Sequence, residues 1–276
     1  MTTYFVTGAN SGIGRALVEG LAARGSDTIV LATRSEERTR PVLADLKARY
    51  PTARTQWVHL DVSDLGSVRR AAQTFVATKQ PIDVLVNNAG IAGTRRLSND
   101  GFDITYATNH IGPFLLTNLL LPRLREAPQG RVVNVASNAH FAAKEMTWSG
   151  LERRTAPKRS GFKDYAVTKL MNILHAKELA RRLAGTRVTT YSLHPGAVAS
   201  NIWRAIPQPI QWIAKLFMLS NEAGARTPLY CATAAELGKT SGRYYYKERE
   251  ARTSPLAGDA ALARELWEKT EAITAP

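Results

Sequence analysis

Short apolar segments alternate with stretches of helical periodicity along most of the chain, and this alternation limits the fold more than any other feature of the sequence. Short, continuous apolar segments are typical of strands in a sheet that is buried on both faces. Strands that alternate with helices build parallel βαβ units with right-handed crossovers. The sequence therefore predicts an α/β protein with a doubly wound parallel sheet between two layers of helices. The predicted strands are Tyr4–Val6, Thr28–Ala32, Gln56–Leu60, Ile82–Val86, Arg131–Val135 and Val188–Leu193, and the predicted helices are 12–24, 35–49, 64–79, 98–121 and 163–184.

The length and composition fit one globular domain spanning residues 1–276. No repeat or low-complexity linker divides the chain, and 44% hydrophobic with 22% charged residues is a globular composition. Cys231 is the only cysteine, which excludes an internal disulfide or a multi-cysteine zinc site, and we expect no metal. A single cysteine fits a reducing cytoplasm.

The net charge of +14 raises the question of an anionic partner. The basic residues are scattered in pairs and no nucleic-acid-binding motif accompanies them, so we expect a basic surface and no nucleic-acid partner. No apolar run reaches the roughly 18 residues of a membrane span. The N-terminus has neither a basic region nor a long apolar region, so we expect no signal peptide, no integral membrane span and a cytoplasmic protein.

A glycine-rich turn follows the first predicted strand at residues 7–14, with the spacing G-x-x-x-G-x-G. Glycines permit positive φ and a close backbone approach, and the helix that follows offers its N-terminal N–H groups to a pyrophosphate. The motif lies between a strand and a helix at the start of a βαβ alternation, which is the context of a dinucleotide site in a Rossmann fold.

The end of the second predicted strand indicates which dinucleotide is bound. NAD sites usually carry an acid here for the ribose 2′-hydroxyl, whereas Thr33 occupies that position and Arg34 follows. A planar guanidinium suits a 2′-phosphate, so the sequence favours NADP(H) over NAD(H). Arg38, one helical turn later, is a weaker second candidate.

Further motifs follow in order. Asn87–Gly90 comes after the fourth predicted strand, Asn109–Gly112 lies in the next helix, and Tyr165–Lys169 has the pattern Y-x-x-x-K. With these motifs the chain resembles the short-chain dehydrogenase/reductase family over residues 3–246, and it is most similar to the subgroup that contains the retinol dehydrogenases.

This resemblance implies a set of functional residues. It assigns catalysis to a tetrad of Asn109, Ser137, Tyr165 and Lys169, in which Lys169 also holds the nicotinamide ribose and Asn109 positions a water molecule. It further implies that two copies can pair through the helices that carry Asn109 and Tyr165, with a monomer left open. The residues predicted to bind the cofactor are Gly8, Asn10, Ser11, Gly12, Ile13, Gly14, Arg34, Asp61, Val62, Asn88, Ala89, Gly90, Tyr165, Lys169, Pro195, Gly196, Val198 and Ser200.

The chemistry of the tetrad can be argued from the residue types. Free tyrosine has a pKa near 10, which is too high for efficient proton exchange at neutral pH. Tyr165 and Lys169 are i and i+4, so they share one helix face, and we expect the ammonium to lower the pKa of the phenol. Tyr165 is then the general acid/base, and Ser137 binds the substrate oxygen. His110, His194 and Cys231 are expected to be packing residues.

Two apolar segments indicate a lipophilic substrate. The stretch between Ser137 and Tyr165 is long and carries Phe141, Met146, Trp148 and Phe162, which we expect to line the substrate site. Residues 201–219 carry further large apolar side chains and are expected to cover the substrate, with core packing, a subunit contact or a lipid-surface contact as alternatives. The membrane-anchored retinol dehydrogenases commonly carry an N-terminal hydrophobic anchor, and we expect none in this protein.

The expected activity is NADP(H)-dependent interconversion of a lipophilic alcohol with its aldehyde or ketone. Retinoid, steroid, polyketide and other ring ketones remain open as substrates. A redox-neutral enzyme on the same fold, such as a cyclase or an epimerase, is one alternative, and a cofactor-binding scaffold without turnover is another.

Overall fold

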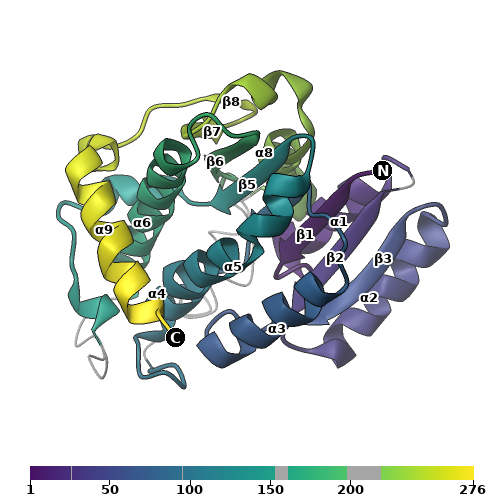
Figure 1. Ribbon diagram of the computed structural model, residues 1–276, viewed down its shortest axis with the longest axis horizontal. Coiled ribbons are helices and arrows are strands. Elements are labelled where there is room, and N and C mark those ends of the chain that lie inside the picture. Colours follow the sequence, from purple (N-terminus) through teal and green to yellow (C-terminus); the bar gives the residue numbers. More distant parts are fainter. Residues whose placement is uncertain (26, 95, 153–160, 198–218) are drawn as a thin grey trace.

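The computed structural model describes residues 1–25, 27–94, 96–152, 161–197 and 219–276, and its strands form one sheet of eight (Figure 1). The sheet order is β3-β2-β1-β4-β5-β6-β7-β8, parallel up to β7, with β8 antiparallel at the edge. The predicted doubly wound parallel sheet is confirmed. The strands are β1 (Thr3–Thr7), β2 (Thr28–Thr33), β3 (Arg54–His59), β4 (Val84–Asn87), β5 (Gly130–Val135), β6 (Val188–His194), β7 (Arg243–Tyr246) and β8 (Arg249–Glu250).

Helices cover both faces of the sheet, as expected for parallel strands joined by crossovers. One layer contains α3, α5 and α6, and the other contains α1, α2 and α8. The long helices are α1 (Gly12–Ala22), α2 (Glu36–Arg49), α3 (Leu65–Ala77), α5 (Gly112–Glu126), α6 (Gly161–Arg182), α8 (Asn221–Thr233) and α9 (Ala260–Thr274). The short ones are α4 (Ile104–Tyr106), a π-helical turn (Ala107–Ile111) and 3-10 turns at Asn138–Ala142, Ser149–Leu151, Ala235–Lys239 and Pro255–Gly258.

The alternation of side chains along the strands divides the core in two. Phe5 lies opposite Val30 on one neighbouring strand and Leu85 on the other, and all three face the α3, α5 and α6 layer. The next positions along, Val6 and Leu31, face the α1, α2 and α8 layer. Because parallel strands pair in register, a side-chain period of two produces two continuous apolar faces.

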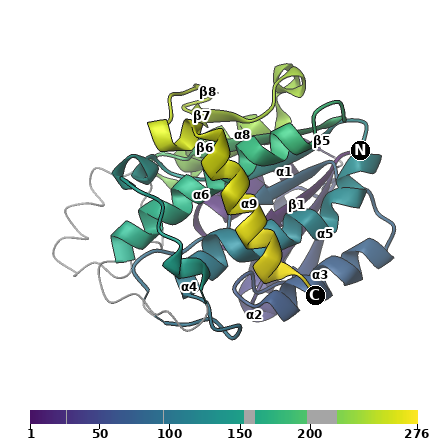
Figure 2. The same ribbon diagram turned by 60° about the vertical axis from the view of Figure 1, so that its left-hand side comes forward.

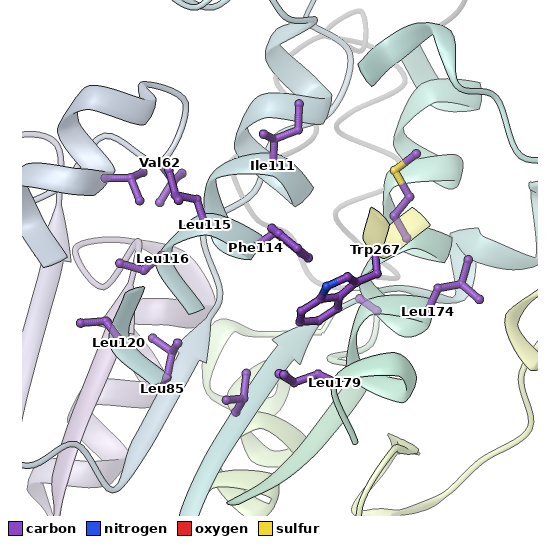
Figure 3. Close-up of a cluster of buried hydrophobic side chains, with 14 of the residues drawn as sticks. Val62, Leu85, Ile111, Phe114, Leu115, Leu116, Leu120, Leu174, Leu179 and Trp267 are labelled. Atoms are coloured by element: carbon purple, nitrogen blue, oxygen red, sulfur yellow. The ribbon is translucent and has the colours of Figure 1, made fainter. Parts of the chain in front are cut away.

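Helix α9 packs outside α6 and closes the first of these cores (Figure 2). Trp267 of α9 meets Phe114 of α5 edge to face, with 4.7 Å between ring centroids (Figure 3). The Arg182 guanidinium lies 4.4 Å from the centroid of the Trp267 ring. A buried hydrogen bond of 2.9 Å joins His110 to Thr270 on α9. The C-terminal helix thus braces α6, which carries Tyr165 and Lys169, and the π-helical turn that carries Asn109.

The predicted helix 98–121 was wrong at both ends. Leu97 and Asp103 form an isolated β-bridge, so residues 98–103 form a turn instead. The Asp103 carboxylate accepts hydrogen bonds from the N–H groups of Thr105 and Tyr106, which caps the helix there. At the other end, α5 continues through Pro122 to Glu126. The elements α8, β7, β8 and α9 were not predicted. The described ranges contain no helix long and apolar enough to span a membrane.

Candidate active site

The turn between β1 and α1 has the backbone of a phosphate-binding loop. Gly8 and Gly12 have φ angles of +67° and +56°, a region that L side chains rarely adopt. Gly14 packs so closely that an added Cβ would overlap the Gly8 carbonyl oxygen and come within 2.6 Å of Asn88 Nδ2. The turn therefore needs glycine at these three positions, and it presents the start of α1 to the cleft beyond the strand.

Thr7 joins this turn to the end of β4. Its buried hydroxyl accepts hydrogen bonds of 3.0 Å from the N–H groups of both Asn88 and Ala89, and donates to the Val86 carbonyl at 3.3 Å. The Asn88 side chain donates in turn to the Thr7 carbonyl at 2.9 Å. Two segments about eighty positions apart are thus held together at the carboxyl edge of the sheet.

A cavity of about 270 Å3 lies at this edge, where the strand order reverses between β1 and β4. Such a switch point is where doubly wound sheets bind their ligands. Arg34, Arg38 and Arg96 line the cavity together with the start of α1, so its walls suit the phosphates of a dinucleotide. Predicted cofactor residues that line it are Gly8, Asn10, Ser11, Gly12, Ile13, Gly14, Arg34, Asp61, Val62, Asn88, Ala89 and Gly90.

The end of β2 presents a guanidinium to the cavity. Arg34 is 63% exposed, and its Nη1 lies 3.5 Å from Asp61 Oδ2. The Thr33 hydroxyl is buried, 2.6 Å from the Thr39 hydroxyl, and accepts a hydrogen bond from the Trp57 indole. Arg34 is therefore the group from this strand end that can meet a phosphate. Arg96 was not predicted, because the sequence showed it only as one of several basic pairs.

Three predicted catalytic residues meet at the carboxyl end of β5. Tyr165 and Lys169 lie one turn apart on α6 and are 6% and 2% exposed. Ser137 lies two positions after the end of the strand at Val135, and its side chain hydrogen-bonds to Tyr165. Lys169 Nζ donates to the Val135 carbonyl at 2.8 Å. The fold thus places a phenol, a hydroxyl and an amine in one buried group.

Burial sets the proton affinities of this group. Desolvation raises the pKa of Tyr165 to about 12, and the hydrogen bond from Ser137 opposes it. Desolvation also lowers the pKa of Lys169 to about 7. The expected lowering of the Tyr165 pKa by Lys169 was wrong for the protein alone, because burial disfavours the charged form of both side chains.

Asn109 lies in the π-helical turn before α5 and borders the same group. Its Oδ1 accepts from the Ile91 N–H at 2.8 Å, and its Nδ2 donates to the Ile91 carbonyl at 2.9 Å and to the Thr168 hydroxyl at 3.0 Å. A Cβ on Gly90 would lie 3.3 Å from Asn109 Oδ1 and 3.5 Å from Lys169 Nζ. Gly90, which lines the cavity, therefore lies close to the buried amine of Lys169. The role of Asn109 in binding a water molecule stays a prediction.

The remaining predicted residues are only partly described. Gly196 follows Pro195 after β6 with a φ of +100°, whereas Val198, Ser200 and residues 201–218 of the predicted cover lie outside the described ranges. Phe141 and Phe162 are 45% and 49% exposed, and Met146 and Trp148 pack against the core. His110, His194 and Cys231 are buried.

The comparisons with known proteins agree with this geometry. The family model described as short chain dehydrogenase matches residues 2–149. The human protein named Dehydrogenase/reductase SDR family member 13 is 39% identical over 98% of this chain and 72% of its own length. Human Retinol dehydrogenase 11 is 37% identical over 95% of this chain and 82% of its own.

A crystal structure of an uncharacterized protein from Mycobacterium paratuberculosis has a TM-score of 0.78 and 32% identity, covering 99% of this chain and 93% of that one. The two human relatives and this crystal structure each match at least 95% of the chain. The protein belongs to the short-chain dehydrogenase/reductase family and is similar within it to the retinol dehydrogenases.

Proposed function

We propose that the protein is an NADP(H)-dependent oxidoreductase that interconverts a lipophilic alcohol with its aldehyde or ketone. The observation that carries this proposal is the buried group of Ser137, Tyr165 and Lys169 beside a cavity with a glycine-rich phosphate loop. Hydride exchange is the chemistry that a nicotinamide supplies when bound. The protein must then orient the carbonyl group and move one proton.

Tyr165 is suited to donate that proton during carbonyl reduction. With a pKa of about 12 its phenol carries the proton at neutral pH and hydrogen-bonds to the Ser137 side chain. A phenol with this pKa is a weak acid, so proton transfer requires the positive charge of Lys169 nearby. Ser137 stabilises the negative charge that develops on the substrate oxygen. An anionic dinucleotide bound in the neighbouring cavity would raise the pKa of Lys169, and the Lys169 ammonium would then favour the phenolate left on Tyr165.

The preference for NADP(H) rests on Arg34. It lines the cavity at the end of β2, where the position typical of an acid is occupied by the buried Thr33. Arg38 and Arg96 add positive charge to the same cavity. A 2′-phosphate would therefore be attracted here, whereas a ribose 2′-hydroxyl would lack its usual carboxylate partner from this strand.

Two observations support a lipophilic substrate. Relatives at 33–39% identity over most of the chain include several named retinol dehydrogenases. Phe141 and Phe162, at either end of the stretch between Ser137 and Tyr165, keep large apolar surfaces exposed. We propose that residues 1–276 form one catalytic domain. A cytoplasmic location and the pairing of two copies stay predictions.

The test is NADPH oxidation, followed at 340 nm, with a panel of apolar aldehydes and ketones. Tyr165→Phe should lower the rate by at least about 100-fold, the usual contribution of general acid catalysis. Binding of NADPH, measured by calorimetry, should remain. Tyr50→Phe, at the end of α2, is the control and should keep the rate.

The other outcomes of the NADPH oxidation experiment contradict the proposed function or favour one of its alternatives. A rate that survives Tyr165→Phe removes the phenol from its role, and absence of NADPH binding rejects the cofactor. Product formation at constant absorbance indicates a redox-neutral enzyme, and binding without turnover of the panel indicates a scaffold.

A further inference from the structure

His140 follows Ser137 by three positions and makes a hydrogen bond through each of its two ring nitrogens. The residue is fully buried in the 3-10 turn Asn138–Ala142 that follows Ser137. Its Nδ1 is 2.7 Å from the Ser137 carbonyl oxygen. Its Nε2 is 3.1 Å from the backbone nitrogen of Ser254, which is 114 positions away in the sequence. The ring therefore joins the serine to the C-terminal part of the chain.

These two partners determine which ring nitrogen carries the proton. The Ser254 N–H can only donate, so Nε2 must be the bare acceptor. The Ser137 carbonyl can only accept, so Nδ1 must carry the hydrogen and donate it. A protonated ring would place an N–H on Nε2 against the Ser254 N–H. Burial lowers the pKa of His140, in agreement with a neutral ring.

Neighbouring aromatic rings hold the imidazole in this orientation. The His140 ring centroid lies 4.1 Å from that of Phe141 and 5.3 Å from that of Tyr244 on β7. The Tyr244 hydroxyl donates to Asn138 Oδ1 at 2.9 Å, which ties the same turn to the strand. The ring cannot turn without disturbing β7, so its hydrogen bond to Ser137 has a fixed direction.

Both polar groups of Ser137 are consequently restrained. Its carbonyl accepts from the His140 ring and also from the His140 backbone N–H at 3.1 Å. Its hydroxyl oxygen accepts from the Ala139 N–H at 3.1 Å, while the side chain also bonds to Tyr165. The ring therefore adds a second hydrogen bond to a carbonyl that the turn already holds through its backbone.

We propose that His140 is a positioning residue, whose ring, anchored on the Ser254 backbone, holds the Ser137 peptide so that the serine hydroxyl meets the substrate oxygen. The proposal rests on the proposed function, because it assigns His140 a role in that reaction. His140 does not touch the substrate and acts only through Ser137. A displacement of the hydroxyl by a fraction of an ångström is enough to slow a reaction that needs aligned groups.

Two amide substitutions separate the two hydrogen bonds. In His140→Asn the side-chain amide can take the place of Nδ1 and keep the donation to the Ser137 carbonyl. In His140→Gln the amide reaches the place of Nε2, so it keeps the bond to Ser254 and loses the one to Ser137. We expect His140→Gln to lower kcat by roughly tenfold with KM for NADPH within twofold, and His140→Asn to recover most of kcat.

The Ser137→Ala background distinguishes positioning from general damage to the fold. If His140 acts through the serine hydroxyl, His140→Gln should lower kcat no further once Ser137 is alanine. A full tenfold loss in that background, or an equal loss in His140→Asn and His140→Gln, overturns the proposal. Thermal melting of every variant shows whether it is folded.

The anchor can be tested by a matched pair at Ser254. Its φ of −61° suits proline, so Ser254→Pro removes the N–H donor with little change of backbone. Ser254→Ala removes a hydroxyl that has no hydrogen-bond partner among the described residues. We expect Ser254→Pro to lower kcat and Ser254→Ala to leave it unchanged. A loss of kcat in Ser254→Ala but not in Ser254→Pro would contradict a role for the hydrogen bond from the Ser254 N–H to His140.

A measurement without turnover keeps this proposal separate from the proposed function. Nitrogen-15 NMR of the labelled wild-type protein should show His140 protonated on Nδ1, and Ser254→Pro should mix the two tautomers. Protonation on Nε2 in the wild type overturns the proposal even if the enzyme is active. A wild type that turns over no member of the carbonyl panel rejects the proposed function, and with it the catalytic role of His140, while the NMR result still decides whether the restraint exists.

Discussion

The Nζ atom of Lys169 lies 5.4 Å from the centroid of the Tyr165 ring, and the two side chains share one buried face of α6. Without a ligand, burial opposes the charged form of both: it raises the pKa of Tyr165 to about 12 and lowers that of Lys169 to about 7. The pair is therefore close to neutral at physiological pH. An anionic ligand in the neighbouring cavity would favour the ammonium, so binding and proton affinity are coupled in this site.

The lowered pKa of Lys169 makes the stability of the protein depend on pH. Between about pH 7 and pH 10.5 the unfolded chain binds one more proton at this residue than the folded protein does, so stability rises with pH in this window. Relative to Lys169→Met, the unfolding free energy of the wild type should increase by about 2 kcal/mol from pH 7 to pH 9. Urea unfolding of the protein without dinucleotide measures this difference.

Lys163→Met is the control for that experiment, because Lys163 is exposed on the same helix. Its stability difference from the wild type should be the same at both pH values. A constant difference for Lys169→Met as well would show that the Lys169 amine is charged in the folded protein at pH 7 and above.

We expect the affinity for NADPH, through its 2′-phosphate, to depend on Arg34. Arg34→Ala removes a guanidinium that lines the cavity, and KM for NADPH should rise about tenfold, the value of one charge-assisted hydrogen bond at an exposed site. KM for NADH should change less than twofold. Arg38→Ala is the comparison and should have the smaller effect on NADPH. Equal effects of Arg34→Ala on the two dinucleotides would contradict a phosphate contact.

The close approach of Gly14 to Gly8 can be tested by adding one carbon atom. A Cβ in Gly14→Ala would overlap the Gly8 carbonyl oxygen and press on Asn88 Nδ2. The loop must then open, at a cost of about 1–3 kcal/mol in the unfolding free energy. Calorimetry should show dinucleotide affinity at least about tenfold weaker, since the N–H groups proposed to bind phosphate move with the loop.

Gly258→Ala is the matched control for Gly14→Ala, because no atom lies within 4 Å of a Cβ placed there. It should keep both the stability and the affinity. If Gly14→Ala behaves in the same way, the loop tolerates a side chain and the close approach has no functional importance.

Loss of the Thr7 hydroxyl should lower the free energy of unfolding. Thr7→Val keeps the volume, but it leaves the buried N–H groups of Asn88 and Ala89 without their acceptor. Unpaired buried groups cost about 1–3 kcal/mol each, so we expect the unfolding free energy to fall by about 2–4 kcal/mol. Thr28→Val, on the neighbouring strand, should change it by less than about 0.5 kcal/mol. Equal and small effects would mean that water replaces the hydroxyl.

Local patterns in the sequence predicted the architecture well. Prediction of central strands such as β4 and β5 succeeded because their short apolar runs reflect burial on both faces, and helices such as α6 were found from their periodicity. The predicted helix 98–121 failed at its start because the Asp103 cap and the bridge to Leu97 compete with helical periodicity. β7 and β8 form a short edge of the sheet with exposed positions, so their residues carry little apolar signal.

The sequence by itself determined the doubly wound fold, the glycine-rich turn and the Tyr165–Lys169 pair, because each depends on residues that are neighbours along the chain. Only the tertiary structure decided that Thr7 joins Asn88, that burial raises the pKa of Tyr165, and that His140 links Ser137 to Ser254. These features depend on residues many positions apart and on the removal of water from between them. Spacing along the chain carries no information about either.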